Sequence, residues 1–330
     1  LSSPVTVTEG NTGTVSANFT VRLDKGTGSN FKVNYQTVDG TAKASDNDYI
    51  PVSGELNFSG AAGQSFPITV RINGDKKIES DEVFAIALSA PDKDFGGRLK
   101  LPASPASVTI INDDSGTITI SPADGREGAY NASFTFSFPD DVSASEPVTI
   151  EYGLSGTATG ADYILSSPGS ITIQPGENSV RLNLDIVDDQ IIELTETVII
   201  TTGSVTSGNP NIAVANSPQT LKIEDNDAAS VTILDMGITE GHSGKKNLMF
   251  NVILDKEVSE PFTLEYATED CVGSVEDNDY EPRSGVLSFE GRANEMRTIV
   301  VPIIGDLKIE KDECFNVKLS NLSTTLDGGL

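Results

Sequence analysis

An internal repeat constrains the fold of this chain more than any other feature of its sequence. Residues 9–88 align without a gap to residues 240–319, at a constant offset of 231 residues, so that Tyr49 corresponds to Tyr280. A middle copy, marked by Tyr163, lies 114 residues after the first. Repeats of roughly 110 residues have the common size of independent domains. The chain is therefore predicted to contain three tandem units.

The predicted units are residues 1–114 (unit 1), 115–227 (unit 2) and 228–330 (unit 3). Acidic runs mark both seams, at residues 112–114 and 224–227, and each run is followed at once by residues typical of a strand. No flexible linker is expected between the units. The first strand of unit 1 and the C-terminal end of unit 3 are expected to be truncated.

Each unit consists of short segments in which apolar and polar residues alternate, which is typical of strands in a half-buried antiparallel sheet. About seven such segments follow one another in roughly 110 residues, which predicts a sandwich of two sheets with almost no helix. The expected core positions of unit 1 are Phe19, Val21, Leu23, Val33, Tyr35, Leu56, Phe58, Ile68, Val70, Ile72, Phe84, Ile86, Leu88, Val108 and Ile110.

The composition excludes several classes of function. The 330 residues include 49 acidic and 22 basic ones, and the net charge of −27 opposes binding to nucleic acids and to anionic membrane surfaces. The chain has no Trp, two Cys and one His, so the side chains of most catalytic and zinc sites are scarce, and we do not expect an enzyme. No apolar run is long enough to span a membrane, so we expect membrane attachment only through parts outside this sequence.

Acidic residues recur at matched positions in the three units, where predicted strands end. In unit 1, Asp48 precedes Tyr49, and Asp75, Glu79 and Glu82 lie around the start of a later strand. Loops at one end of a sandwich can gather such residues, although carboxylates ~4 Å apart repel each other by about 1 kcal/mol per pair in water. A cation would remove this repulsion. Calcium, which takes roughly six to eight oxygen ligands, fits this set better than zinc or copper.

Two other interpretations of the acidic residues are open. They can serve only to keep a β-protein soluble and to protect its sheet edges. Paired carboxylates also catalyse glycoside hydrolysis, but three copies of the set and the absence of Trp argue against a single sugar-binding cleft.

The chain resembles the Calx-β domain family over nearly its whole length, three times in succession. In unit 1 the resemblance rests on Asp39–Tyr49 (DGTAKASDNDY), Gly54–Phe58 (GELNF), Asn73–Glu82 (NGDKKIESDE) and Val108–Asp114 (VTIINDD). It implies an all-β fold, with immunoglobulin-like sandwiches of about seven antiparallel strands each. Three of them in tandem would form an elongated rod. Such domains occur in sodium/calcium exchangers, in an integrin tail and in many bacterial surface proteins.

The resemblance also implies calcium ligands from four places: a Glu after the first strand, the Asp before the tyrosine, the acidic loop and the terminal Asp run. In unit 1 these positions hold Glu9, Asp48, Asp75, Glu79, Glu82, Asp113 and Asp114. In unit 2 they hold Glu127, Asp162, Asp188, Asp189, Glu193, Glu196, Asp225 and Asp227. In unit 3 they hold Glu240, Asp279, Asp306, Glu310 and Glu313.

The three sets are not equally complete. Unit 2 keeps Asp188 where Gly74 and Gly305 stand in the other units, and unit 3 ends before a terminal Asp run. We therefore predict that calcium affinity decreases from unit 2 to unit 1 to unit 3, with dissociation constants of about 10⁻⁴–10⁻³ M, as in extracellular modules. Cys271 and Cys314 either form a disulfide, which would fit an oxidising compartment, or remain free.

These features predict a calcium-binding structural or adhesive repeat array of a secreted or cell-surface protein, expected to be bacterial, in which calcium stiffens the joints between units. The alternative is a regulatory calcium sensor, as in a sodium/calcium exchanger. The expected partners are calcium ions and a cell-surface, matrix or glycan ligand. Nucleic acid is not an expected partner, and the chain is expected to be a monomer.

Overall fold

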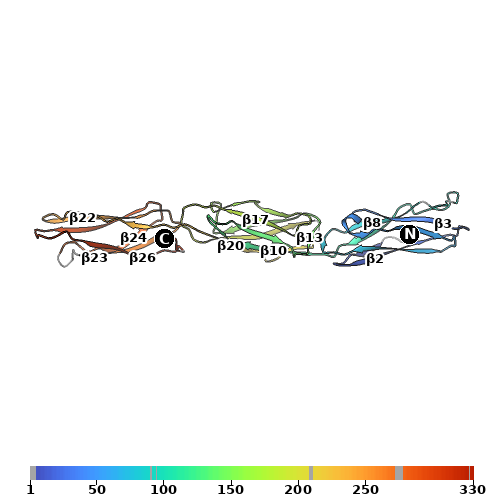
Figure 1. The fold of residues 1–330 in the computed structure, drawn as a ribbon, viewed down its shortest axis with the longest axis horizontal. Coiled ribbons are helices and arrows are strands. Elements are labelled where there is room, and N and C mark those ends of the chain that lie inside the picture. Colours follow the sequence, from blue (N-terminus) through green and yellow to red (C-terminus); the bar gives the residue numbers. More distant parts are fainter. Residues whose placement is uncertain (1–4, 90, 94, 208–210, 272–277, 327) are drawn as a thin grey trace.

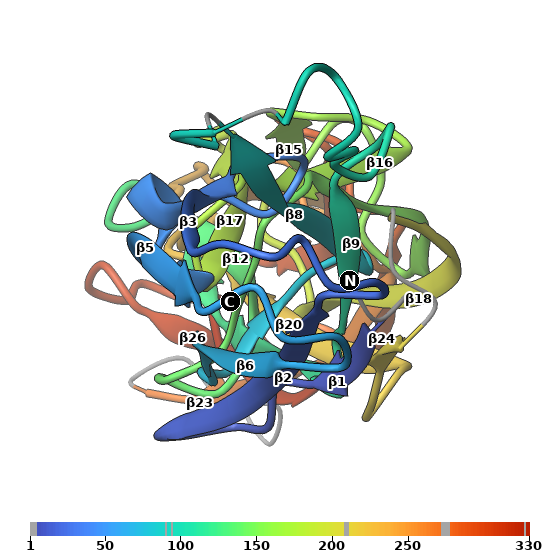
Figure 2. The same ribbon diagram turned by 90° about the vertical axis from the view of Figure 1, so that its right-hand side faces the viewer.

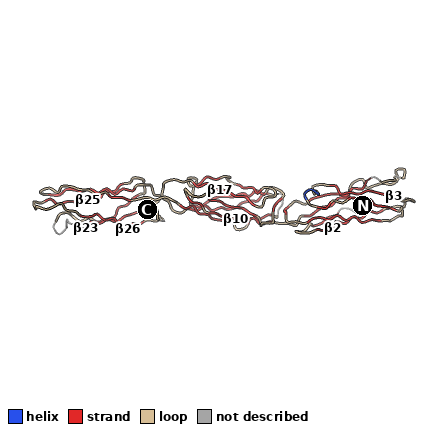
Figure 3. The backbone as a smooth tube through the Cα atoms, viewed as in Figure 1, coloured by secondary structure: helices blue, strands red, loops and turns tan. Residues whose placement is uncertain are grey.

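The structure is a computed structural model, and it describes residues 5–89, 91–93, 95–207, 211–271, 278–326 and 328–330. Three β units lie in a row along one axis (Figure 1), and the view along that axis shows them one behind another (Figure 2). Strands dominate each unit (Figure 3), and among the described residues the one helical element is the 3₁₀ turn η1, Ala44–Asp46. In this described part of the chain, no helix has the length and apolar character needed to cross a membrane.

Unit 1 is a sandwich of a five-stranded and a three-stranded sheet. The five-stranded sheet has the order β1-β9-β8-β3-β5, and the smaller sheet has the order β2-β6-β4. The strands are β1 (Val5–Thr8), β2 (Thr14–Arg22), β3 (Phe31–Val38), β4 (Tyr49–Ile50), β5 (Ser53–Phe58), β6 (Ser65–Asn73), β7 (Lys77–Ile78), β8 (Glu82–Ser89) and β9 (Ala106–Ile111).

Unit 2 has two five-stranded sheets, with the orders β15-β17-β12-β10-β19 and β11-β20-β18-β14-β16. The strands are β10 (Gly116–Ala123), β11 (Gly125–Arg126), β12 (Ala132–Ser137), β13 (Ser143–Ala144), β14 (Val148–Gly156), β15 (Tyr163–Leu165), β16 (Ser170–Ile173), β17 (Ser179–Ile186), β18 (Glu196–Thr206), β19 (Ile212–Val214) and β20 (Gln219–Glu224).

Unit 3 has two three-stranded sheets, with the orders β21-β22-β25 and β24-β23-β26. The strands are β21 (Val231–Ile233), β22 (Gly244–Leu254), β23 (Phe262–Asp270), β24 (Ser284–Phe289), β25 (Met296–Gly305) and β26 (Phe315–Ser323). The chain then returns to the junction with unit 2, where the carbonyl of Gly329 accepts a hydrogen bond from the Ala229 backbone at 2.8 Å.

The alternating residues form the cores, as the sequence predicts. Phe19, Phe84 and Val108 are almost completely buried between the two sheets of unit 1, and only Tyr35 and Leu88 of the expected positions are partly exposed. Each unit has its own hydrophobic cluster. The prediction of tandem all-β sandwiches is thus confirmed.

The pairing is not antiparallel throughout. β1 pairs in parallel with β9, and in unit 2 β11 pairs in parallel with β20 and β10 with β19. In unit 2 the chain crosses between the sheets at this point: β10 pairs with β12 in one sheet, and β11, directly after it, joins the opposite sheet. The parallel pairing places the residue after β1 or β11 beside the end of the last strand.

Neighbouring units are joined by one loop of the preceding unit. Ile78, in the loop between β6 and β8 of unit 1, lies in the hydrophobic cluster of unit 2, and β7 pairs in parallel with β13. The carbonyl of Ile78 accepts a hydrogen bond from the Ser145 backbone at 3.0 Å. Ile192 makes the same contact one unit later: it lies in the cluster of unit 3 and pairs with Val258. We call Ile78 and Ile192 the plug residues.

Candidate metal centres

The predicted acidic residues gather in clusters of three. Each member contributes one carboxylate oxygen, and the three oxygens of a cluster lie within 4.8 Å of one another. The clusters are 1A (Glu9, Asp113, Asp114), 1B (Asp48, Glu79, Glu82), 2A (Glu127, Asp225, Asp227), 2B (Asp162, Glu193, Glu196) and 3A (Glu240, Asp306, Glu310).

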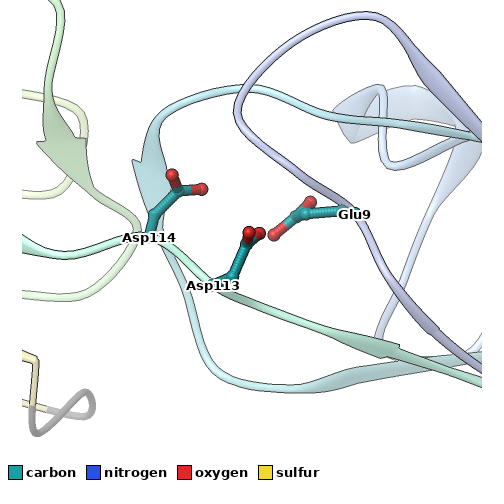
Figure 4. A group of neighbouring side chains, drawn as sticks. All are labelled: Glu9, Asp113 and Asp114. Atoms are coloured by element: carbon teal, nitrogen blue, oxygen red, sulfur yellow. The ribbon is translucent and has the colours of Figure 1, made fainter.

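The parallel pairing of first and last strands builds clusters 1A and 2A. Thr8, the last residue of β1, pairs with Ile111, the last residue of β9. Glu9 therefore lies beside the Asp run that follows β9, and its backbone N–H donates to the Ile111 carbonyl at 3.3 Å. Figure 4 shows the carboxylates of Glu9 and Asp113 pointing toward each other, with Asp114 beside them. In unit 2 the backbone of Glu127 donates to the carbonyl of Glu224 at 3.0 Å in the same way.

Cluster 1B is positioned by a buried tyrosine. Tyr49 follows Asp48 directly, is 2% exposed, and stacks on Phe84 with ring centroids 4.1 Å apart. Its hydroxyl donates a hydrogen bond to Asp39. Tyr280 stacks on Phe315 in unit 3 at 4.4 Å. Both tyrosines therefore pack the loop edge, and they fix the position of the neighbouring aspartate.

The acidic loop has the same local geometry in each unit. The backbone N–H two residues later in the chain donates to an aspartate of the loop, at 2.8 Å for Asp75, 2.7 Å for Asp189 and 2.6 Å for Asp306. In units 1 and 2 this aspartate lies near both clusters of its unit. Burial is the largest cause of the raised pKa values of the neighbouring glutamates; Asp75 raises those of Glu9 and Glu79 further, and Asp189 those of Glu127 and Glu193.

Crowding of negative charge perturbs the clusters strongly. Burial, followed by repulsion from Asp75 and the other acidic residues nearby, raises the pKa of Glu9 to about 8. Burial and the acids around it likewise raise the pKa of Glu127 to about 7. The pKa of Glu82 and that of Glu196 rise to about 7, again first through burial and then through Asp48 and Asp162. Without a cation, these carboxylates resist ionisation near neutral pH.

Three carboxylate oxygens of the clusters are buried without a hydrogen-bond partner: Asp114 Oδ2, Glu127 Oε2 and Asp227 Oδ2. Buried acceptors are normally satisfied, so unpaired anionic oxygens aimed into acidic clusters indicate room for a cation. Lysines compensate part of the charge: Lys77 pairs with Glu79 at 2.5 Å and Lys256 with the other oxygen of Asp227 at 3.1 Å. The all-oxygen donor set fits calcium.

The remaining predicted residues lie at the borders of these clusters. Asp188 accepts a hydrogen bond from the Asn226 side chain at 3.0 Å, beside cluster 2A. Asp279 and Glu313 line a groove that also contains Glu240 and Glu310 of cluster 3A.

Backbone packing explains why units 1 and 3 lack a counterpart of Asp188. A Cβ atom at Gly74 would lie 2.0 Å from the carbonyl oxygen of Gly10, and one at Gly305 would lie 2.7 Å from that of Gly241. No side chain fits at these positions. The missing carboxylate is thus the consequence of a close approach of two loops.

The structure settles one alternative that the sequence leaves open and reveals one feature that the sequence does not indicate. Cys271 and Cys314 form a disulfide, with Cα atoms 5.5 Å apart, across the end of β23 and the start of β26. The sequence alone does not identify the role of the plug residues Ile78 and Ile192, although isoleucine recurs directly before the first glutamate of each acidic loop. The third copy, Ile309, is fully exposed.

Comparison with known proteins gives three matched segments. The family model of the Calx-beta domain matches residues 2–114, 140–237 and 224–329. The chain is 28% identical over 184 residues to the adhesion G-protein coupled receptor V1 of Danio rerio; the match spans 49% of this chain and 3% of the receptor.

Solved structures with a likeness to the chain include CBD12 from CALX1.2 and the calcium binding domain CBD12 of CALX1.1. Their sequences are 18% and 19% identical to it, and the matches cover 67% of this chain and 96% and 97% of those chains. The TM-scores are 0.30 and 0.29.

Proposed function

The chain belongs to the Calx-beta domain family, and from this premise we propose that it is a calcium-binding structural array whose ions stiffen the joints between units. Calx-beta domains are calcium-binding, non-catalytic domains. The proposed ligands are the acidic residues of clusters 1A, 1B, 2A, 2B and 3A, together with Asp75, Asp188, Asp189, Asp279 and Glu313. Calcium would supply the positive charge that lets these carboxylates ionise together.

The observation that carries this proposal is the position of the plug residues within the acidic loops. Ile78 directly precedes Glu79 of cluster 1B, and Ile192 directly precedes Glu193 of cluster 2B. The isoleucine of each loop is therefore buried in the core of the next unit. We propose that the adjacent glutamate binds the ion. Ion binding would order the loop that makes the joint.

Ion pairs also cross the joints between units. Asp227 of cluster 2A pairs with Lys256 of unit 3 at 3.1 Å, and Lys76 of unit 1 pairs with Asp141 of unit 2. At free calcium tenfold above the dissociation constant, each site adds about 1.4 kcal/mol to the stability of the state that binds it. Several sites at one joint would therefore limit its bending.

A secreted or cell-surface location and an adhesive role are part of the proposal. The disulfide between Cys271 and Cys314 supports an oxidising compartment. The similarity to an adhesion receptor supports a place in an extended extracellular region, although the match spans only 3% of that receptor.

Small-angle X-ray scattering of the whole chain, stripped of calcium and then reloaded, tests the stiffening. The proposal predicts a longer, narrower distance distribution with calcium. The variant Asp113→Asn/Asp114→Asn, altered in cluster 1A, should respond less at the first joint. The control Asp24→Asn, an exposed acid outside the clusters, should respond like the parent. An unchanged distribution in the parent would contradict the proposal.

Affinity distinguishes the array from the alternative of a regulatory sensor. Dissociation constants of about 10⁻⁴–10⁻³ M fit an extracellular module, whereas values of about 10⁻⁷–10⁻⁵ M fit a sensor. We favour the array because the plug residues couple the acidic loops of units 1 and 2 to the core of the next unit, which suits a mechanical role.

A further inference from the structure

In unit 1, two hydrogen bonds clamp the loop that follows β3 to the start of β8. The backbone N–H of Val83 donates to Thr41 Oγ1 at 2.8 Å, and the backbone N–H of Ala42 donates to the Val83 carbonyl at 3.1 Å. The two segments approach so closely that only glycine fits before the threonine, because a Cβ atom at Gly40 would lie 2.2 Å from the Val83 carbonyl oxygen. We call this pair of hydrogen bonds the clamp.

Unit 2 repeats the clamp. The Thr197 backbone N–H donates to Thr157 Oγ1 at 2.8 Å, and the Thr197 carbonyl accepts a hydrogen bond from the Ala158 backbone at 3.1 Å. A glycine again precedes the threonine, and a Cβ atom at Gly156 would lie 2.1 Å from the Thr197 carbonyl oxygen.

The clamp joins the two sides of cluster 1B. On one side, Glu82 directly precedes Val83. On the other side, the backbone N–H of Lys43, two residues after Thr41, donates to the Asp48 carboxylate at 2.7 Å. Asp48 and Glu82 belong to the same cluster, so the clamp fixes their relative positions.

Unit 3 carries its disulfide where units 1 and 2 have the clamp. At the offset of 231 residues, Cys271 stands in place of Gly40 and Cys314 in place of Val83. Cys271 directly follows β23 and Cys314 directly precedes β26, at the end where these two strands pair. The residue after Cys271 is a valine, so the sequence also lacks the threonine hydroxyl of the clamp. A covalent bond therefore stands in place of the hydrogen bonds.

The disulfide connects two of the calcium ligands proposed for unit 3. Glu313 directly precedes one cysteine, and Asp270 directly precedes the other. Asp270 accepts a hydrogen bond from the Tyr280 hydroxyl at 2.5 Å, and Tyr280, which is 3% exposed, directly follows Asp279. Asp279, Glu313 and Cys314 line the same groove. The disulfide thus has the same place between these acids as the clamp has between Asp48 and Glu82.

We propose that the disulfide between Cys271 and Cys314 positions Asp279 and Glu313 for calcium, in place of the clamp of units 1 and 2. This role rests on the calcium-binding function proposed above. Loss of a contact that orients metal ligands typically lowers metal affinity by about ten- to a hundredfold. The calcium affinity of unit 3 therefore depends on the bond between the two cysteines, whereas units 1 and 2, which contain no cysteine, are insensitive to reduction.

The bridge is accessible to a reductant, since both cysteines are exposed. Dithiothreitol transfers two electrons and two protons to the disulfide, which becomes two thiols, and is itself oxidised to a cyclic disulfide.

The test is hydrogen–deuterium exchange of the whole chain, followed by mass spectrometry across a calcium titration, before and after reduction. In the oxidised chain, calcium should protect the three acidic loops, residues 75–82, 189–196 and 306–313. After reduction, protection of residues 306–313 should need about tenfold or more calcium. The loops of units 1 and 2 are internal controls and should respond as before.

Two variants separate positioning from stability. Cys271→Ser/Cys314→Ser should respond to calcium like the reduced parent, with or without dithiothreitol. Cys271→Gly/Val272→Thr/Cys314→Val carries the clamp residues of unit 1 and should recover the calcium response of the oxidised parent without a disulfide. Thermal unfolding verifies that both variants fold.

An equal calcium response of residues 306–313 in the oxidised parent and the serine variant would overturn the positioning role. So would a folded glycine–threonine–valine variant that responds as weakly as the serine variant. In both cases the loops of units 1 and 2 still respond, and the proposed function stands. Absence of protection in all three loops would overturn the proposed function and the positioning role together.

Discussion

Ile78 packs directly over Gly116, across the joint between units 1 and 2. A Cβ atom at Gly116 would lie 2.6 Å from Cδ1 of Ile78 and 2.6 Å from Cε1 of Phe138. The first residue of β10 is thus a glycine because an isoleucine of the preceding unit occupies the space of its side chain. The two units share this contact, so the joint is part of the core of unit 2.

Truncation of the plug residue tests this view of the joint. Ile78→Ala removes a side chain that is 1% exposed and should destabilise unit 2 by about 2–5 kcal/mol, in the range of large-to-small core substitutions. Ile309→Ala is the matched control at the same position of unit 3, where the side chain is fully exposed, and should stay within about 0.5 kcal/mol of the parent. Denaturant unfolding measures both. Equal effects would contradict the assignment.

A complementary substitution overfills the same space. Gly116→Ala places a methyl group against Ile78 and Phe138 and should cost about 1–3 kcal/mol. Gly153→Ala, in β14, meets nothing within 4 Å and serves as the control. Thermal unfolding should separate the two variants. A Gly116→Ala protein as stable as the control would mean that the joint is loosely packed.

Neutralising one acid of cluster 2A should have opposite effects with and without calcium. Glu127→Gln removes a carboxylate whose pKa is raised to about 7, so the calcium-free chain should become more stable at pH 8. The same variant loses a charged ligand, and calcium affinity of unit 2 should fall about tenfold or more. Glu177→Gln, at an exposed residue outside the clusters, should change neither quantity. Loss of stability without calcium would count against the repulsion described here.

The stability of the calcium-free chain should fall as the pH rises from about 5 to about 8. Glu9 has a folded pKa of about 8, against an ordinary value of 4.5, so in this window the folded state binds more protons than the unfolded state. Deprotonation then disfavours folding. Carboxyl groups with lowered pKa values, such as Asp39 and Glu295, titrate below this window. Melting temperatures across the pH range, with and without calcium, measure the effect; a flat profile in chelator would contradict it.

The sequence predicts the strands because they depend on local spacing, and it predicts the matched acidic positions because they recur with the repeat. The period of two sets which side chains are buried, and the 231-residue offset places Glu240 where Glu9 stands. What it does not predict depends on contacts between separate segments. The role of Ile78 needs the end-to-end placement of two units, and the absence of a carboxylate at Gly74 needs the approach of the Gly10 carbonyl. The parallel pairing of β1 with β9 likewise joins segments from opposite ends of unit 1.

Isothermal calorimetric titration of calcium into the chelator-stripped whole chain shows whether the acidic clusters bind calcium. We expect saturable heat from several ions per chain, with dissociation constants of about 10⁻⁴–10⁻³ M. Proton release that changes with pH should accompany binding, because Glu9 and Glu127 must ionise to bind. The absence of saturable heat would contradict the account and would leave the clusters as uncompensated negative charge.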